Sequence, residues 1–323
     1  MQQLKSIHYL RAAAAIMVVV FHIYSNVPFM SPYVENVFWL RGGVDIFFVI
    51  SGYVMVKSTE NRTVLPKQFI TDRAKRIIPM YWIATFATMM QIDGQWAFKL
   101  KSSLFIPALH PETKMMQPVL EPGWTLNYEM FFYIIFTISL FFNRRHQIPF
   151  VATCIFGFVF FGLSVDGSRI FEFYGRPIIL EFLMGMLVAK LKFNWPKISL
   201  PAGLLLMYAL QPLNLDRIFA LGIPAMLIVA GAISAEKYVR SSQIMDLLGS
   251  ASYSIYLFHL IALGMIVYLH PLLGLSHFTF VILSLLGCLI CGCAFYWALE
   301  RPIIAYFSKQ KNNLAEPKHA GIS

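Results

Sequence analysis

An arginine and a histidine interrupt an apolar segment near the amino terminus. Arg11 and His22 are separated by eleven positions, and every residue from Ala12 to Phe21 is apolar. In a helix, which turns about 100° per residue, the two side chains would point within about 20° of each other and lie about 16 Å apart along the axis. Because a charge at the bilayer centre costs about 2.5–3.5 kcal/mol, both are expected to face one interior groove. A histidine there can move protons; the plainer alternative is a boundary arginine and a histidine bonded to a neighbouring helix.

Two carboxylates are expected at a depth similar to that of His22. Asp45 lies about two helical turns, and Glu129 about one and a half turns, inside their predicted helices, counted from the outer ends. A carboxylate beside a histidine can fix its tautomer and stabilise its charged form, which suits Asp45. A buried carboxyl group such as Glu129 can exchange protons with a substrate hydroxyl. Its alternative role is that of a salt-bridge or hydrogen-bond partner.

A pair of arginines precedes the third apolar segment. Arg73 and Arg76 lie three residues apart, on one face of a predicted helix, just before Ile77 and Pro79. Paired guanidinium groups suit phosphate recognition through forked, charge-assisted hydrogen bonds. The alternative is an ordinary topology signal or contact with lipid headgroups.

Three other groups carry weaker signals. His259 lies in an apolar segment and is interpreted as a packing or network residue, whereas Glu181 could line an outer cavity. No spacing among the histidines resembles a metal-ligand motif, so no metal is expected. The four cysteines lie in apolar runs and are interpreted as small helix-packing residues.

The elements that must position these side chains follow from the composition. Of the 323 residues, 58% are hydrophobic and only 13% are charged, where an ordinary soluble domain carries about 25% charge. The composition excludes a typical soluble enzyme and predicts an all-α polytopic membrane protein, a bundle of about ten transmembrane helices. The ten predicted spans cover residues 7–27, 37–56, 77–92, 124–142, 148–164, 176–191, 198–213, 217–235, 252–269 and 278–298.

The net charge of +10 is explained by topology. With the amino terminus in the cytoplasm, most of the 26 Lys and Arg residues fall on the inner side of the membrane and most acidic residues on the outer side. Both termini are therefore expected to be cytoplasmic, and binding of nucleic acid is not expected. A membrane domain is predicted over residues 1–307, followed by a polar cytoplasmic tail over residues 308–323.

Taken together, these motifs resemble the membrane-bound acyltransferase family 3, which modifies bacterial surface glycans, antibiotics and lipids. The resemblance covers nearly the whole chain, in order. The residues and segments that carry it are Arg11 with His22, Gly43–Gly52, Arg73 with Arg76, Pro79 and Tyr81, Trp124–Glu129, Tyr253–His259, and Glu300 with Arg301 and Pro302. Many relatives carry a second acidic residue after the glutamate, where this chain has Met130, so the acidic role is assigned to Glu129 alone.

The resemblance implies an O-acyltransferase of the bacterial inner membrane that uses acyl-CoA, usually acetyl-CoA, and needs no metal. It implies catalytic roles for His22, Asp45 and Glu129, with His22 as general base or covalent acyl carrier. Arg11, Arg73 and Arg76 would bind the CoA phosphates. The acceptor would be a surface glycan or its lipid-linked precursor, with aromatic residues such as Trp124 and Tyr128 near the outer face, although these rings could equally anchor the protein at the membrane interface.

A transporter or flippase for a polar solute is the alternative from another class of protein. Interior Arg, His, Asp and Glu residues are also what a proton-coupled carrier needs. Two observations argue against a transporter. The sequence has no evident inverted repeat, and the arginine pair Arg73 and Arg76 lies at only one end of the bundle. Stabilisation of the purified protein by acyl-CoA would distinguish the two classes.

Overall fold

The described part of the protein is built almost entirely from helices. The computed structural model describes residues 4–60, 63–90, 94–165, 167–191 and 197–315. The helices of ten or more residues are α1 (Lys5–Ser25), η1 (Ser31–Gly42, a 3-10 helix), α2 (Gly43–Thr59), α3 (Pro66–Met89), α5 (Gly123–Ser139), α6 (Arg144–Ser164), α8 (Leu180–Lys190), α9 (Ser199–Ala209), α10 (Ile223–Ser234), α11 (Gln243–Leu273), α12 (His277–Phe295) and α13 (Arg301–Ala315). Shorter helices include α4 (Trp96–Ser103), α7 (Arg169–Tyr174), and two π-helical segments, η4 (Ile218–Gly222) and η6 (Tyr296–Glu300).

Each of the ten predicted spans coincides with a helix. Among the described residues, five helical stretches are long and apolar enough to cross a membrane: Lys5–Ser25, Ser31–Thr59, Arg144–Ser164, Gln243–Leu272 and His277–Gln310. The helices Ser199–Ala209 and Ile218–Ser234 are apolar but shorter. These helices and the composition indicate a membrane protein, while the number of ten crossings and the orientation of the termini stay predictions.

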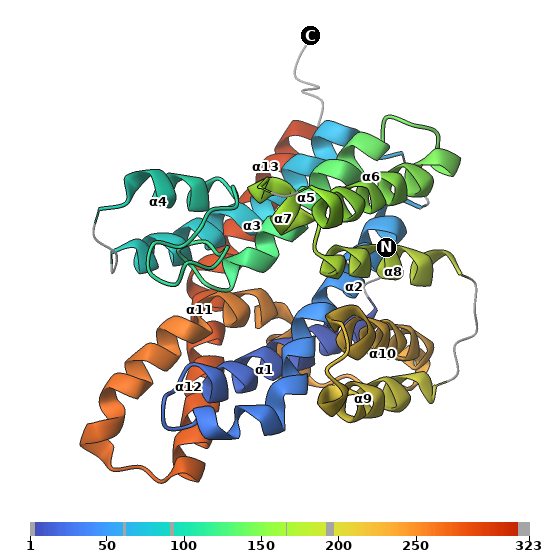
Figure 1. Ribbon diagram of the computed structural model, residues 1–323. Coiled ribbons are helices and arrows are strands. Elements are labelled where there is room, and N and C mark those ends of the chain that lie inside the picture. Colours follow the sequence, from blue (N-terminus) through green and yellow to red (C-terminus); the bar gives the residue numbers. More distant parts are fainter. Residues whose placement is uncertain (1–3, 61–62, 91–93, 166, 192–196, 316–323) are drawn as a thin grey trace, which may run out of the picture.

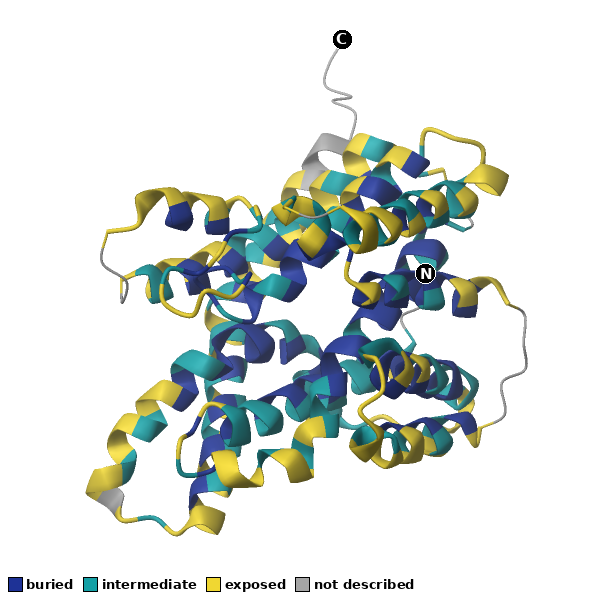
Figure 2. Cartoon of the chain, viewed as in Figure 1, coloured by how far each residue is buried: buried dark blue, intermediate teal, exposed yellow. Residues whose placement is uncertain are grey.

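Helices α1 and α2 lie at the centre of the molecule. Helix α1 packs against α2, α10, α11 and α12, and α2 packs against α5, α8 and α10. In Figure 1 both lie near the middle of the view, with α3 to α7 and α13 above them, α9 and α10 to the right of α1, and α11 and α12 to its left. Buried residues concentrate along this centre, whereas the outer helices carry most of the exposed ones (Figure 2). The residues singled out in the first two spans are therefore held in the core of the bundle.

Two glycines bring α2 and α8 into backbone contact. A side-chain carbon on Gly52 would collide with the carbonyl oxygen of Phe182, and one on Gly185 would collide with that of Val49. Glycine is therefore required on both helices, because any larger residue would push the backbones apart. This close contact fixes the position of α2, which carries part of the site described below.

The carboxyl-terminal segment is more ordered than the prediction of a polar tail from residue 308 implies. Helix α13 begins at Arg301 and continues to Ala315, and it packs against α3. The rest of the predicted tail, residues 316–323, lies outside the described residues.

Candidate functional site

A cavity of about 310 Å³, here called the inner cavity, opens between α1, α2, α3, α5 and α11. Its apolar wall includes Val44, Phe47, Ile50 and Leu126. Its polar lining consists of Arg11, Ser51, Tyr53, Arg73, Arg76, Thr125, Glu129, Tyr133, Ser252, Tyr253 and Tyr256. The volume lies within the range of small-molecule and cofactor sites, about 300–1,000 Å³.

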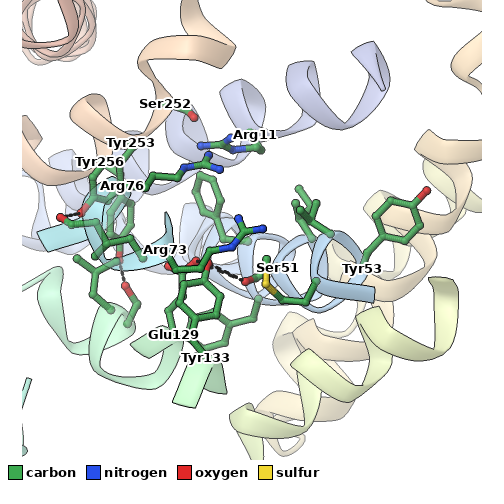
Figure 3. Close-up of a pocket in the computed structure, with 18 of the residues that line it drawn as sticks. Arg11, Ser51, Tyr53, Arg73, Arg76, Glu129, Tyr133, Ser252, Tyr253 and Tyr256 are labelled. Atoms are coloured by element: carbon green, nitrogen blue, oxygen red, sulfur yellow. Dashed lines mark hydrogen bonds between the residues drawn. The ribbon is translucent and has the colours of Figure 1, made fainter. Parts of the chain in front are cut away.

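The three arginines predicted to bind phosphate converge on this cavity. Arg11 comes from α1, and Arg73 and Arg76 come from α3; Figure 3 shows their guanidinium groups around one space. Arg11 and Arg76 form no hydrogen bond or ion pair with any residue that the structure describes. Arg73 donates one hydrogen bond to Ser58 at 3.4 Å, while its Nε is buried without a partner among the described residues. Their donors are thus available to an anion.

Glu129 lies in the same cavity, within a small network of hydroxyl groups. The Tyr133 hydroxyl, one turn further along α5, donates a hydrogen bond to Oε1 of Glu129. Ser51 on α2 donates to the same oxygen at 3.4 Å. Glu129 is therefore a hydrogen-bond acceptor that lines the cavity.

His22 lies beyond the cavity wall, paired with a second histidine. Its Nδ1 is 2.9 Å from the carbonyl oxygen of Val18 and 3.0 Å from Nε2 of His259. His259 is buried, and its Nδ1 is 2.8 Å from the carbonyl oxygen of Tyr256. Tyr256 in turn lines the inner cavity, and its ring centroid is 6.1 Å from that of His259. The predicted network role of His259 therefore agrees with the structure.

These contacts determine which nitrogen of His22 is free. A carbonyl oxygen only accepts hydrogen bonds, so Nδ1 carries the proton in both neutral rings. Nε2 of His259 is then an acceptor, and the Nδ1 proton of His22 is shared between it and Val18. Nε2 of His22 consequently holds a lone pair and forms no hydrogen bond with a described residue. This is the form of histidine required of a base or nucleophile.

The expected pairing of Asp45 with His22 is wrong. Arg217 donates to the fully buried Asp45 twice, from Nη2 to Oδ2 at 2.7 Å and from Nε to Oδ1 at 3.0 Å. This bidentate ion pair links α2 to the segment that begins α10, and it uses both carboxylate oxygens. The sequence indicated the depth of Asp45 along its helix but not the direction in which its side chain points around the helix axis. In the structure the side chain points toward Arg217.

Of two further expectations about the outer half, the one for Tyr128 needs revision and the one for Glu181 stays a prediction. Tyr128 is fully buried, and its hydroxyl donates to the carbonyl oxygen of Phe173, so it neither contacts an acceptor nor anchors the protein at the interface. Glu181 is also fully buried, and it lines neither the inner cavity nor the second cavity described below. Its carboxylate oxygens have no hydrogen-bond partner among the described residues.

The similarity of the chain to known proteins agrees with this arrangement. A family model described as an acyltransferase domain matches residues 4–297. The chain belongs to acyltransferase family 3. A curated relative in this family, the exopolysaccharide production protein ExoZ of Rhizobium meliloti (strain 1021), is 36% identical over an alignment of 287 residues that covers 81% of this chain and 89% of the relative. No solved structure matches the chain.

Sequence reasoning missed four residues of this acyltransferase: Ser51, Tyr133, Arg217 and Tyr256. A signal existed for Tyr133, because residues four apart on a helix are neighbours and Glu129 precedes it by four. Arg217 stands at the outer end of a predicted span, where the positive-inside rule does not explain an arginine, but its partner Asp45 lies on another helix and could not be read from the sequence. Ser51 and Tyr256 lie in the Gly43–Gly52 and Tyr253–His259 segments that carry the family resemblance, but only the packing of α2, α5 and α11 shows what they contact.

If His259 holds the tautomer of His22, its replacement should slow acyl transfer without weakening the binding of the donor. We expect His259→Ala to lower the turnover about 10–100-fold, the loss typical of removing a partner that orients a histidine. His259→Gln, whose amide oxygen can still accept the Nδ1 proton, should recover part of this loss. The measurement is the rate of CoA thiol release by membranes that contain equal amounts of each variant. Equal rates for the Ala and Gln variants would show a packing role alone.

Proposed function

We propose that the protein transfers an acyl group, most simply acetyl, from cytoplasmic acyl-CoA to a hydroxyl group of an extracytoplasmic or lipid-linked glycan at the bacterial inner membrane. One observation carries the proposal: Arg11 and Arg76 form no hydrogen bond or ion pair with a described residue, and they face a cavity that contains Glu129 and ends near the His22–His259 pair. Unpaired guanidinium groups suit a phosphate-bearing donor. The name of the relative, which refers to exopolysaccharide production, supports a glycan as the acceptor.

The donor would enter with its phosphates against the arginines. Arg11, Arg73 and Arg76 would bind the anionic groups, and the largely uncharged pantetheine arm would extend along the apolar wall of α2 and α5. Tyr256 closes this path next to His259. The thioester would therefore reach His22 past the ring of Tyr256.

Two routes of transfer are compatible with a free Nε2 on His22. In the first, Nε2 takes the proton of the acceptor hydroxyl as its oxygen attacks the thioester carbonyl, and the CoA thiolate leaves and is then protonated. In the second, Nε2 attacks the thioester, CoA leaves, and the acceptor oxygen then takes the acyl group from the imidazole. In both, Glu129 would accept or return a proton at the cavity, assisted by Tyr133 and Ser51.

Binding of the donor provides the direct test. We expect acetyl-CoA to raise the thermal unfolding midpoint of the purified protein in a concentration-dependent way, because a ligand that binds only the folded state stabilises it. Acetyl phosphate, which lacks the pantetheine arm, serves as the control and should have little effect. No shift with acetyl-CoA at millimolar concentration would contradict the proposal and favour a carrier for polar solutes.

The acceptor can be identified by loss of the modification. Removal of the gene should eliminate an acyl ester from one envelope glycan, and NMR of the purified glycans would identify which one. Restoration by the wild-type protein, but not by the His22→Ala variant, would link the ester to this site. Unchanged ester content in every glycan fraction would exclude a glycan acceptor.

A further inference from the structure

A second cavity, here called the basic mouth, lies next to the inner cavity and has a volume of about 790 Å³. It is formed by α1, α3, α11, η6 and α13. Its lining combines basic and neutral polar side chains with aromatic and aliphatic ones; those used below are Arg11, Lys67, Lys75, Arg76, Tyr296 and Phe307. The family model ends at residue 297, so α13, which carries Phe307, lies beyond the part of the chain that the model matches.

The charges of the basic mouth favour an anionic ligand. Four lining side chains are Lys or Arg, and two, Asp72 and Glu300, are acidic. Glu300 is buried, accepts a hydrogen bond from Ser254 at 2.6 Å, and interacts electrostatically with Arg11 and Arg76, so it offsets part of their positive charge. The cations therefore exceed the acids on a surface with room for more than one phosphate.

Aromatic rings lie beside these cations. Phe307 on α13 has its ring centroid 5.1 Å from Nζ of Lys75 on α3, and Tyr296 lines the same cavity. A ring next to phosphate-binding cations is the arrangement that recognises a nucleotide, because a base stacks on the ring while the phosphates bind the cations. An anionic lipid would use the cations but would not need the ring.

The basic mouth and the inner cavity share two side chains. Arg11 and Arg76 line both cavities. A ligand that occupied both would therefore place its central anionic group between these two guanidiniums. Such a ligand would have a nucleotide in the basic mouth, a central anionic group at the two arginines, and an uncharged arm in the inner cavity. CoA has these three parts in this order.

We propose that the basic mouth binds the adenosine 3′,5′-bisphosphate end of the CoA donor, with Phe307 of α13 as the wall on which adenine stacks. The inference rests on the proposed function, since it assigns the second half of the same donor. Lys67 and Lys75 bind the 3′-phosphate, and Arg11 and Arg76 bind the pyrophosphate. Helix α13 is thus part of the substrate site rather than a passive extension of the chain.

The test compares three ligands on the full-length protein in phosphatidylcholine nanodiscs. The affinities of CoA, 3′-dephospho-CoA and 4′-phosphopantetheine are measured by calorimetry or thermal shift. We expect CoA to bind about tenfold more tightly than 3′-dephospho-CoA in the wild type, because the latter lacks the phosphate assigned to the lysines. Phe307→Ala should weaken CoA about tenfold but leave 4′-phosphopantetheine, which has no adenine, unchanged.

Two matched controls keep the result specific. Tyr306→Ala changes the adjacent, exposed aromatic residue of α13, which does not line the basic mouth, and it should bind all three ligands as the wild type does. Lys75→Ala should remove the preference for CoA over 3′-dephospho-CoA, whereas Lys309→Ala, on a residue outside the lining, should retain it.

The outcomes separate this inference from the proposed function. If none of the three ligands binds the wild type, the donor assignment fails and this inference fails with it. If CoA binds but Phe307→Ala and Lys75→Ala behave as the wild type, the assignment of CoA as donor is retained. The nucleotide then binds outside the basic mouth, and this inference is wrong. If CoA and 3′-dephospho-CoA bind equally and phosphatidylglycerol in the nanodiscs displaces both, the basic mouth is a lipid-headgroup site, which overturns the inference.

Discussion

His22→Ala is expected to lower acyl transfer about 10²–10⁴-fold, the range that a positioned acid–base group contributes. The reason is that Nε2 of His22 is the free nitrogen of the histidine pair, with its tautomer set by Val18 and His259. Binding of acyl-CoA should remain close to that of the wild type, because His22 does not line the cavity that contains the arginines. The measurements are the rate of CoA thiol release and the acetyl-CoA-dependent rise in unfolding midpoint.

A matched control for this variant is His146→Ala, which removes an exposed histidine on α6 and should leave both measurements unchanged. Near-normal turnover of His22→Ala would refute the catalytic assignment. Mass spectrometry of the wild type, trapped with acetyl-CoA in the absence of an acceptor, distinguishes the two routes. An acyl group on His22 indicates the covalent route, and its persistent absence indicates the general base.

The double variant Arg73→Ala with Arg76→Ala is expected to show the largest loss of donor affinity. A hydrogen bond to a charged group contributes about 1.5–3 kcal/mol, so the loss of two such partners amounts to about 3–6 kcal/mol, or roughly 10²–10⁴ in the dissociation constant of CoA. Once CoA is saturating, the turnover should recover much more than the affinity, because the His22–His259 pair is intact. The measurement is the dependence of rate and thermal stabilisation on CoA concentration.

Its control removes two arginines from the start of α6, outside both cavities. Arg144→Ala with Arg145→Ala changes the net charge by the same amount, and neither residue lines a cavity described above. If the two double variants lose CoA affinity equally, the effect comes from total charge rather than from a phosphate site.

The sequence predicted the position of the helices well, because a long apolar segment has a single low-energy solution in a membrane. Every predicted span overlaps a described helix, but charges did not always mark the helix ends: α3 begins at Pro66 and contains Arg73 and Arg76. Helical periodicity also placed Arg73 and Arg76 on one face, and both line the inner cavity. Relations within one helix are fixed by helix geometry alone, so sequence suffices for them.

Relations between helices were harder to predict. The depth of Asp45 in the second span could be counted, but its direction depends on how α2 is rotated against its neighbours. That rotation is determined by the contact of Gly52 and Gly185 with the opposite backbones and by the ion pair with Arg217. The pairing of His22 with His259 depends in the same way on the packing of α1 against α11.

The glycine contact between α2 and α8 has a consequence for how the site can change. Side chains between two helices can usually repack when a neighbouring residue changes. At the contact between Gly52 and the Phe182 carbonyl no side chain lies between the two backbones, so no such repacking is available. Helix α2 therefore cannot turn about its axis to accommodate a different acyl group. Any change in the range of acyl groups must therefore come from substitutions on the opposite walls of the cavity, on α3, α5 and α11. Helix α2 keeps its position while those side chains change.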